Sequence, residues 1–281
     1  MMRQINTDKV TDLVEKLCIE ANCNLTDDIY TCLKDCGKKE KSVLGKSILN
    51  TLVENADIAR RGTDPICQDT GMTVVFVTMG QDVHIEGGFL EDAINEGVRR
   101  GYEKGYLRKS VVKDPLDRVN TKDNTPAIIH YELVPGDKFH ITVAPKGFGS
   151  ENMSRLIMLK PSQGLPGIKD FVINTISEAG ANPCPPIIVG IGIGGTMERA
   201  AYLSKKALLR PVNEKNSRPD LAELEAELLD SINALGIGPA GFGGTTTALS
   251  VSILTNATHI AGLPVSVNIG CHATRHAEGD L

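Results

Sequence analysis

Hydrophobic residues recur at helical spacing through the first 62 residues of the chain. Five apolar positions share one face of the first predicted helix: Val10, Leu13, Val14, Leu17 and Cys18. The same spacing predicts a second helix over 29–36 and a third over 43–59. Thr26, followed by two aspartates, is typical of an N-cap with an acidic first turn. The pattern therefore predicts a helical N-terminal segment over residues 1–62.

Strand and helix patterns alternate through the remaining residues. Runs rich in β-branched residues and bounded by turn residues predict five strands: 73–77, 127–133, 138–143, 187–189 and 265–269. Helical spacing predicts four more helices: 87–104, 166–180, a segment from Gly195 through Leu209, and 220–235. The linker Val134-Pro135-Gly136-Asp137 favours a β-hairpin between the strands on either side of it. The apolar stretch 247–254 fits either a helix or another buried segment.

This order of elements predicts an α/β fold, with mixed sheets flanked by helices and a helical segment at the N-terminus. A chain of 281 residues can bury roughly three-quarters of its unfolded surface, so a sizeable core needs no disulfides. The sequence contains no internal repeat, low-complexity tract or long linker. We therefore expect a single domain over 1–281, which includes the helical segment 1–62.

Composition narrows the class of protein. The net charge is -5, only 4% of the residues are aromatic, and Trp is absent. An acidic chain with few aromatic residues and no basic stripe does not favour nucleic acid or an anionic membrane as a partner. The sequence has no apolar stretch of roughly 18 residues that could span a membrane, and residues 1–8 lack the apolar segment of a signal peptide. We expect a cytoplasmic protein.

The seven cysteines fall into two settings. In a reducing compartment they are expected to be core thiols or metal ligands rather than disulfides. Four belong to the helical segment and are predicted to be packed thiols: Cys18, Cys23, Cys32 and Cys36. Three lie in loops beside strands, next to Pro or Gly and polar neighbours: Cys67, Cys184 and Cys271. Loops of this kind display ligand-bearing residues, although each cysteine taken alone is more often structural.

Two glycine-rich segments leave alternatives open. The segment 190–195 satisfies the pattern G-x-G-x-x-G between a predicted strand and helix, which would suit a nicotinamide-dinucleotide-binding oxidoreductase module. The polar loop 210–219 stands where the second strand of that motif and its acidic residue belong, and the same amides could instead bind a carboxylate. The segment 241–246 lacks the lysine of a Walker A loop, so it is either a structural turn or an anion site at a helix start.

Six strings, read together and in this order, resemble the class I iron–sulfur fumarate hydratases, specifically the α subunit of the two-subunit form. They are Cys67-Gln68-Asp69-Thr70-Gly71, Gly105-Tyr106-Leu107-Arg108, Asp123-Asn124-Thr125-Pro126-Ala127, Lys146-Gly147-Phe148-Gly149-Ser150-Glu151-Asn152-Met153, Asn182-Pro183-Cys184-Pro185-Pro186 and Gly270-Cys271-His272. The resemblance extends from about residue 40 to the end of the chain. None of the strings is decisive alone, but the ordered set is specific.

The resemblance implies a 4Fe-4S cluster whose three protein ligands are Cys67, Cys184 and Cys271. The fourth iron would keep an open position for substrate, as an open catalytic zinc site does. By the same analogy three residues bind substrate: Gln68, Arg108 and Gly147. Asp69 and His259 are the candidates for proton transfer or for orienting the groups that perform it. From the residues alone, Arg108 would be a solvated helix-end charge and His259 a hydrogen-bonded core residue.

The resemblance also implies a reaction and a partner. The expected reaction is the interconversion of fumarate and L-malate, and the alternative within the family is that of an L-tartrate dehydratase α subunit. Single-chain relatives supply further site residues from a second domain, and no such domain follows Cys271 in this sequence. We therefore expect a separate β subunit to complete the site, with a small dicarboxylate as substrate.

Overall fold

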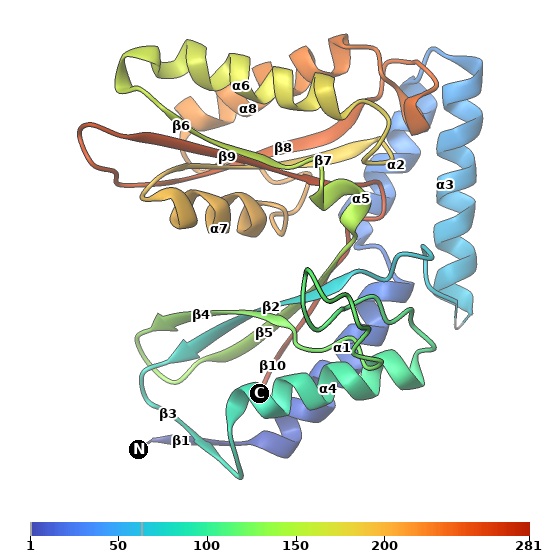
Figure 1. The fold of residues 1–281 in the computed structure, drawn as a ribbon. Helices are drawn as coiled ribbons and strands as arrows, with labels where there is room; N and C mark the ends of the chain where they lie inside the picture. Colours follow the sequence, from blue (N-terminus) through green and yellow to red (C-terminus); the bar gives the residue numbers. More distant parts are fainter. Residues whose placement is uncertain (1, 63) are drawn as a thin grey trace. The chain divides into compact units, whose positions relative to one another are not determined.

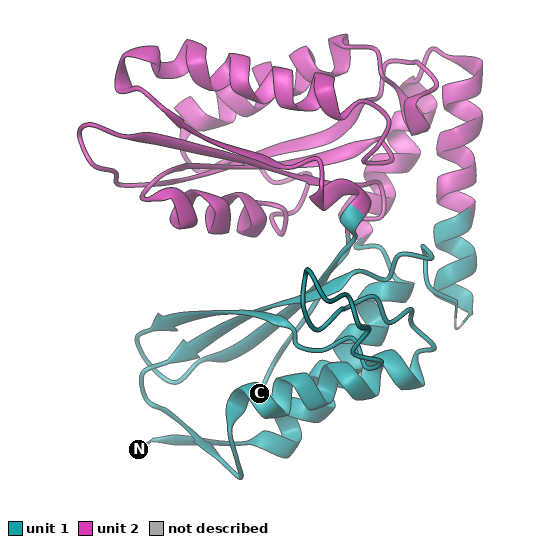
Figure 2. Ribbon diagram, viewed as in Figure 1, with its two compact units in different colours: residues 1–26, 55–148, 275–281 teal, residues 27–54, 149–274 magenta. Residues whose placement is uncertain are grey.

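The computed structural model describes residues 2–62 and 64–281. The chain divides into two compact units, coloured separately in Figure 2. Unit 1 contains residues 1–26, 55–148 and 275–281, and unit 2 contains residues 27–54 and 149–274. The expectation that all of 1–281 behaves as one domain stays a prediction. Among the described residues, no helix is both long and apolar enough to cross a membrane.

Unit 1 is a four-stranded mixed sheet covered by two helices (Figure 1). The strand order is β10-β5-β2-β4, and the bounds are β2 (Met72–Gly80), β4 (Ile128–Val134), β5 (Phe139–Lys146) and β10 (Ala277–Asp280). The helices α1 (Thr7–Cys23) and α4 (Leu90–Lys104) pack together, and β1 (Arg3–Asn6) pairs in parallel with β3 (Val83–Glu86). A Cβ at Gly97 would lie 2.7 Å from the Thr11 carbonyl oxygen. Glycine in α4 therefore permits the close contact with α1.

Unit 2 is a second four-stranded mixed sheet with helices on both faces (Figure 1). The strand order is β6-β9-β7-β8, and the bounds are β6 (Arg155–Leu159), β7 (Ile187–Gly194), β8 (Ala248–Asn256) and β9 (Leu263–Gly270). Helix α7 (Met197–Ala207) covers one face, and α6 (Gly164–Ala179) and α8 (Pro219–Ala234) cover the other. The other α-helices of the described residues are α2 (Asp27–Lys39), α3 (Val43–Arg61), which contributes residues to both units, and the short α5 (Phe148–Glu151), and two 3-10 helices are η1 (Pro161–Gln163) and η2 (Pro239–Gly241). The predicted fold class and the helical N-terminal segment are confirmed, with β1 as an added short strand.

The predicted hairpin at 134–137 is wrong. Strands β4 and β5 do not pair with each other; each pairs with β2, which lies between them, β4 in parallel and β5 antiparallel. The linker passes over the end of β2, where the Gly80 amide donates to the Lys138 carbonyl at 2.6 Å. A Cβ at Gly80 would lie only 2.2 Å from the Gly136 carbonyl oxygen. The turn-forming residues therefore serve a crossing connection.

The structure also assigns two segments of the glycine-rich region. The stretch 247–254, which fitted either a helix or another buried segment, lies in strand β8 from residue 248 onward. The predicted loop 190–195 belongs to β7 as far as Gly194. A Cβ at Gly190 or Gly192 would lie 2.1 Å from the carbonyl oxygen of Ser204 or Ala200 in α7. These glycines let α7 lie against the strand, so the dinucleotide-binding interpretation is wrong for this segment.

We predict that Gly192→Ala destabilises the chain, because the added methyl group must push α7 away from β7. Overpacking of this kind costs about 1–3 kcal/mol. Urea unfolding followed by circular dichroism would measure this loss of stability as a lower unfolding midpoint, with the dependence of the unfolding free energy on urea concentration unchanged. Gly262→Ala is the matched control, since a Cβ there meets nothing closer than 3.8 Å. An equal midpoint for the two variants would contradict the packing role.

Candidate functional site

The Cys67 loop of unit 1 is held by hydrogen bonds to the peptide groups of Ile66. The Ile66 amide donates to the Asn22 carbonyl at 2.9 Å, and the Asn55 side-chain amide donates to the Ile66 carbonyl at 2.8 Å. Ile66 itself is buried, whereas the neighbouring Cys67 is half-buried and its sulfur lies 3.5 Å from the Gln68 side-chain oxygen. The loop thus presents Cys67 and the exposed Gln68 from an anchored backbone.

Asp69 is fixed in orientation by two backbone amides. Its Oδ1 accepts from the Gly71 amide at 3.0 Å, and its Oδ2 accepts from the Phe148 amide at 2.9 Å. A Cβ at Gly147 would lie 3.1 Å from Oδ2, so the glycine keeps this approach open. The Arg275 guanidinium donates to the Asp69 carbonyl at 2.6 Å. The structure therefore brings Asp69 and Gly147 together, as the sequence analysis expected for two residues of one site.

Arg108 joins the same cluster through its backbone. The Thr70 hydroxyl donates to the Arg108 carbonyl at 2.8 Å, so the backbone of Arg108, whose side chain is exposed, is bonded to the residue that follows Asp69. Asn124 fixes the next residues: its Oδ1 accepts from the Ser110 amide at 2.7 Å, and its amide donates to the Gly71 carbonyl at 3.1 Å. Unit 1 thus gathers the Cys67 loop, Asp69, Arg108 and Gly147.

Three residues that hold these site residues of unit 1 in place were not among the functional candidates of the sequence analysis. Asn124 is fully buried with a positive φ of 63°, and the buried Tyr102 hydroxyl donates to the Thr70 carbonyl at 2.6 Å. Burial is the main reason that the pKa of Tyr102 lies above its usual value. The third is Arg275, which is only 3% exposed. The string 123–127 contained the one available signal, an Asn before Thr-Pro, but nothing in the sequence showed its partners.

Unit 2 contributes the other two candidate cysteines on adjoining turns. The His272 amide donates to the Cys184 carbonyl at 3.3 Å, and His272 Nδ1 lies 3.0 Å from the same oxygen. Cys184 is exposed and Cys271 is half-buried. The Thr274 hydroxyl and amide both donate to the Cys271 carbonyl, at 2.8 and 2.9 Å. Both thiols are reduced and displayed from turns, which suits ligands of an iron–sulfur cluster.

The third candidate ligand, Cys67, belongs to unit 1, so each unit by itself offers at most two of the three thiols. Among the described residues, no group of three or more His, Cys, Asp or Glu side chains is arranged to hold a single metal ion. The four other cysteines were predicted to be packed thiols. Cys18 and Cys23 are buried as expected, whereas Cys32 and Cys36 are only half-buried.

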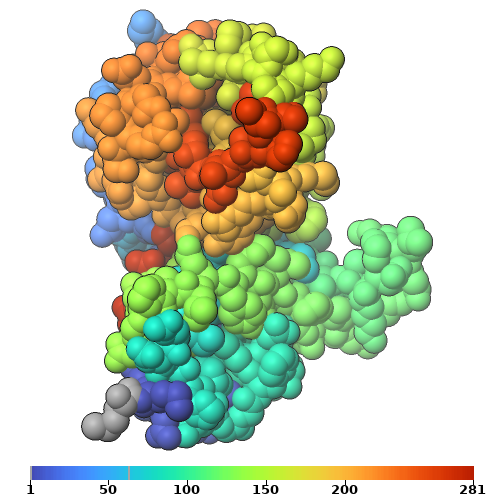
Figure 3. Space-filling view, turned by 90° about the vertical axis from the view of Figure 1, so that its left-hand side faces the viewer, coloured from blue at the N-terminus to red at the C-terminus, as the bar shows by residue number. Residues whose placement is uncertain are grey.

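His259 lies apart from the two thiols of its own unit. It is exposed in the connection between β8 and β9, whose colour appears as the orange-red surface on the face of unit 2 seen in Figure 3. Cys271 follows the opposite end of β9. The eight residues of β9 span about 26 Å at 3.3 Å per residue, so His259 and Cys271 of one chain are not close together. The expectation that His259 is a core residue is also not met.

The glycine-rich loop before β8 surrounds a carboxylate of the chain itself. Glu40 is 2% exposed, and its oxygens accept from the Ser42 amide at 2.9 Å and from the Thr245 amide at 2.9 and 3.0 Å. Burial favours the neutral acid, but hydrogen bonds from these amides and from the Thr245 and Thr246 hydroxyls outweigh it and lower the pKa of Glu40 to about 2. Of the two interpretations of 241–246, a structural turn or an anion site at a helix start, the structure shows a loop before a strand whose donors bind a carboxylate of the same chain.

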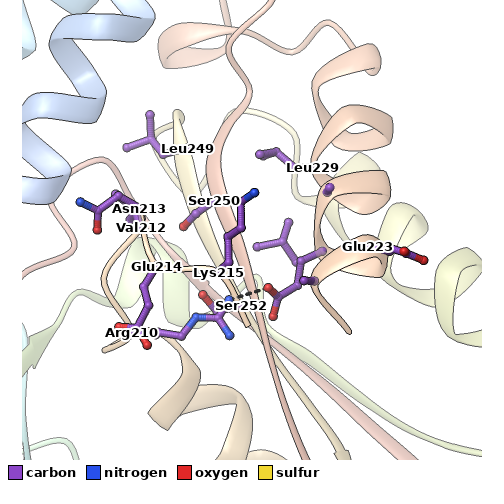
Figure 4. Close-up of a pocket in the computed structure, with 14 residues that line it drawn as sticks. Arg210, Val212, Asn213, Glu214, Lys215, Glu223, Leu229, Leu249, Ser250 and Ser252 are labelled. Atoms are coloured by element: carbon purple, nitrogen blue, oxygen red, sulfur yellow. Dashed lines mark hydrogen bonds and ion pairs between the residues drawn. The ribbon is translucent and has the colours of Figure 1, made fainter. Parts of the chain in front are cut away.

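A separate cavity of about 470 Å³ opens beside β8 (Figure 4). Its lining includes Ser250 and an ion pair in which the Arg210 guanidinium donates to Glu225 at 2.7 Å. Ser250 Oγ and Arg210 Nε are buried without a hydrogen-bond partner among the described residues. None of the candidate site residues lines this cavity. Arg210 and Glu225 pair with each other, and the cavity gives no separate indication of a catalytic site.

Comparison with known proteins decides the family. A sequence model described as fumarate hydratase (Fumerase) matches residues 11–280. The chain belongs to the fumarate hydratase family. A Methanocaldococcus jannaschii protein named "Putative L(+)-tartrate dehydratase subunit alpha" is 46% identical over 275 residues, which cover 96% of each chain. The L(+)-tartrate dehydratase subunit alpha of Escherichia coli (strain K12) is 35% identical over 283 residues, which cover 99% of this chain and 92% of that protein.

The expected family is therefore confirmed, and this member of the fumarate hydratase family is a hydro-lyase. Its relatives carry names of alpha subunits, which implies a separate partner subunit. The family model and the names of the relatives point to two different substrates, so the choice between them belongs to the proposal below.

We predict that the stabilising effect of Glu40 depends on pH. A carboxylate with a lowered folded-state pKa stabilises the fold fully above its unfolded pKa, and the effect disappears as pH falls through the folded value. With a folded pKa of about 2, the contribution of ionisation is about 3 kcal/mol at pH 7, and about half of it is lost by pH 3. Urea unfolding of wild type and Glu40→Gln from pH 7 to pH 3 would measure the difference, with the exposed Asp230→Asn as a charge control. A difference independent of pH would contradict this account.

Proposed function

We propose that this chain is the α subunit of a 4Fe-4S hydro-lyase that interconverts fumarate and L-malate. The observation that carries the proposal is that unit 1 brings Asp69, Arg108 and Gly147 together, in a chain that belongs to the fumarate hydratase family. The residues that the resemblance assigns to substrate come from three separate strings, and within unit 1 side-chain hydrogen bonds connect these strings: Thr70 donates to the Arg108 carbonyl, and Asp69 accepts from the Phe148 amide.

Each of these site residues, and Gln68 with them, has a proposed role that its chemistry supports. The Arg108 guanidinium is exposed and can bind a substrate carboxylate through two parallel N–H donors. Gln68 is also exposed and offers an amide for a second polar group of the substrate. Each Asp69 oxygen accepts one backbone hydrogen bond and keeps a lone pair, so Asp69 can hold a proton in a fixed direction. Gly147 has no Cβ, which would otherwise crowd that carboxylate at 3.1 Å from Oδ2.

The proposed cluster ligands are Cys67, Cys184 and Cys271. When bound, a cluster with three protein ligands would supply a Lewis-acidic iron with an open position. Loss of the substrate hydroxyl and of the proton next to a carboxylate both develop negative charge. Arg108 is proposed to stabilise this charge on the substrate side. The remaining positive donors are proposed to come from a separate β subunit.

L(+)-tartrate dehydration is the second candidate reaction, and the names of the relatives support it. Tartrate differs from malate by one hydroxyl group. A site that hydrogen-bonds this hydroxyl discriminates strongly between the two, so substrate choice can depend on a single donor or acceptor. We keep fumarate and malate first because the family model over residues 11–280 carries that name.

We predict that Cys67→Ser, Cys184→Ser and Cys271→Ser each abolish the cluster. Serine lacks the thiolate that iron prefers, so anaerobically purified variants should lose iron, sulfide and the brown absorbance near 400 nm. Cys32→Ser, a half-buried cysteine of α2, is the matched control and should keep all three. A colourless wild-type chain would contradict the proposal.

The same preparation tests the reaction. The chain alone should be inactive, and co-expression with the β subunit should give hydratase activity. Comparing kcat/KM for L-malate and L(+)-tartrate then decides between the two substrates. Full activity of the chain without a β subunit would overturn the expectation of a partner.

His259 keeps its proposed role only as a residue of a second copy of this chain. One strand of about 26 Å separates it from Cys271 of the same unit, whereas substrate at the cluster must lie within a few ångströms of any proton-transfer group. A second copy can supply the imidazole without any change in the fold of unit 2. His259 is exposed, as this role requires.

Complementation tests this assignment. His259→Asn and Cys184→Ser should each be inactive when co-expressed with the β subunit. Mixing the two in one assembly should restore up to about a quarter of wild-type activity, because half of the mixed α pairs contain one intact site. No recovery would show that His259 does not act from another copy, and a fully active His259→Asn would remove it from the mechanism.

A further inference from the structure

Cys184 has a backbone conformation that its neighbours must maintain. Its φ is 53°, in the left-handed region that residues with a side chain rarely adopt. Such conformations persist where surrounding contacts determine them. The Cys184 amide donates to the Ala181 carbonyl at 3.0 Å, and its own carbonyl accepts from the His272 amide at 3.3 Å. The direction of the thiol therefore depends on the positions of the residues on either side of it.

The loop 238–246 contacts both sides of Cys184. On one side, the Ala240 amide donates to the Pro185 carbonyl at 2.7 Å. On the other, a Cβ at Gly241 would lie 2.3 Å from the Cβ of Ala181, so these residues meet as closely as glycine allows. Ala240 also has a positive φ, of 52°. The loop thus acts as a clamp whose own shape must be held.

Glu40 holds this loop from the helical segment. Its carboxylate accepts from the Thr245 amide and from the Thr245 hydroxyl at 3.0 Å. A Cβ at Gly244 would lie 3.0 Å from Glu40 Oε1, so the loop wraps the carboxylate closely. The other donors are the amides of Lys41 and Ser42, at 2.8 and 2.9 Å, just before α3. One buried carboxylate therefore connects the start of α3 to the loop that contacts Ala181 and Pro185 on the two sides of Cys184.

We propose that Glu40 is a positioning residue for the cluster ligand Cys184, acting through the contacts of loop 238–246 with Ala181 and Pro185. The assignment of Cys184 as a ligand rests on the proposed function, whereas the contact path is a property of unit 2 alone. Glu40 touches neither substrate nor cluster in this account. It sets the turn from which the thiol is displayed.

Hydrogen–deuterium exchange of the full, cluster-free chain tests the path directly. Glu40→Gln should replace an acceptor by an NH₂ group that faces backbone donors, and the loop should open more often. Loss of a charge-assisted hydrogen bond changes such an equilibrium by roughly tenfold or more. Amides in peptides covering 181–184, 238–246 and 272 should therefore exchange roughly tenfold faster, while β7 and α8 stay protected.

Glu225→Gln is the matched control, because Glu225 is a second buried carboxylate of unit 2. Its Oε1 accepts from the Ile253 amide at 2.7 Å, so this variant should speed exchange near Ile253 and leave 181–184 unchanged. Gly241→Ala should reproduce the Glu40→Gln pattern by clashing with Ala181. Gly236→Ala has a similar positive φ and an open surrounding, so it controls for backbone strain. Equal exchange at 181–184 in Glu40→Gln and Glu225→Gln would overturn the proposal.

A second measurement links the path to the metal. In the reconstituted protein, a chelator should remove iron roughly tenfold faster from Glu40→Gln than from Glu225→Gln at a temperature where both stay folded. Equal rates of iron release from the two variants, together with faster amide exchange in Glu40→Gln, would show that Glu40 stabilises only the loop. That result would overturn its positioning role. A wild-type chain that binds no iron would contradict the proposed function, while the exchange experiment would still read the contact path.

Discussion

Hydrogen bonds from buried side chains to the backbone of irregular segments are the constraint on which the candidate site depends. Residues that bind or react are displayed from loops, and loops have no ladder of their own to satisfy or fix their peptide groups. In unit 1 Asn124 supplies this order, because it joins Ser110 to Gly71. In unit 2 Glu40 does so for the loop before β8. Burial restricts the conformations of these two side chains, and the loops that they bond are restricted as well.

Close approach of one backbone segment to another is the second constraint. It explains why several glycine-rich segments of this chain resemble ligand-binding loops. Gly190 and Gly192 have the spacing of a phosphate-binding motif, yet the backbone of α7 occupies the space that a side chain at either position would need. Gly71 has a positive φ of 75°, and a Cβ there would lie 2.7 Å from the Lys146 amide nitrogen. A glycine motif therefore shows that something comes close, and only the structure shows whether it is a ligand or another element.

The fold class and most helices follow from hydrophobic spacing, because burial of one face leaves a periodic record in the chain. Strand pairing leaves no such record. The linker 134–137 has hairpin residues and still connects two strands that flank β2, since turn chemistry sets a local change of direction but not the neighbour of each strand. Likewise β8 was open to a helical interpretation, because periodicity alone does not distinguish a short buried strand from a buried helix. Asn124 and Glu40 were missed as functional because their partners are 53 and 205 residues away.

Resemblance to a family transfers residue types and roles, but not the copy of the chain that supplies each residue. The string Gly270-Cys271-His272 and the upstream His259 are close in sequence, which suggests one site. The intervening strand β9 turns this short separation into the length of the sheet. Cys184 shows the opposite case: it is 87 positions from Cys271, yet its carbonyl bonds the residue next to Cys271. Sequence distance and spatial distance are thus inverted in unit 2, because an extended strand separates its ends more effectively than any other element of the same number of residues. An exposed imidazole at one end of such a sheet can act on chemistry at the other end only when another copy presents it there.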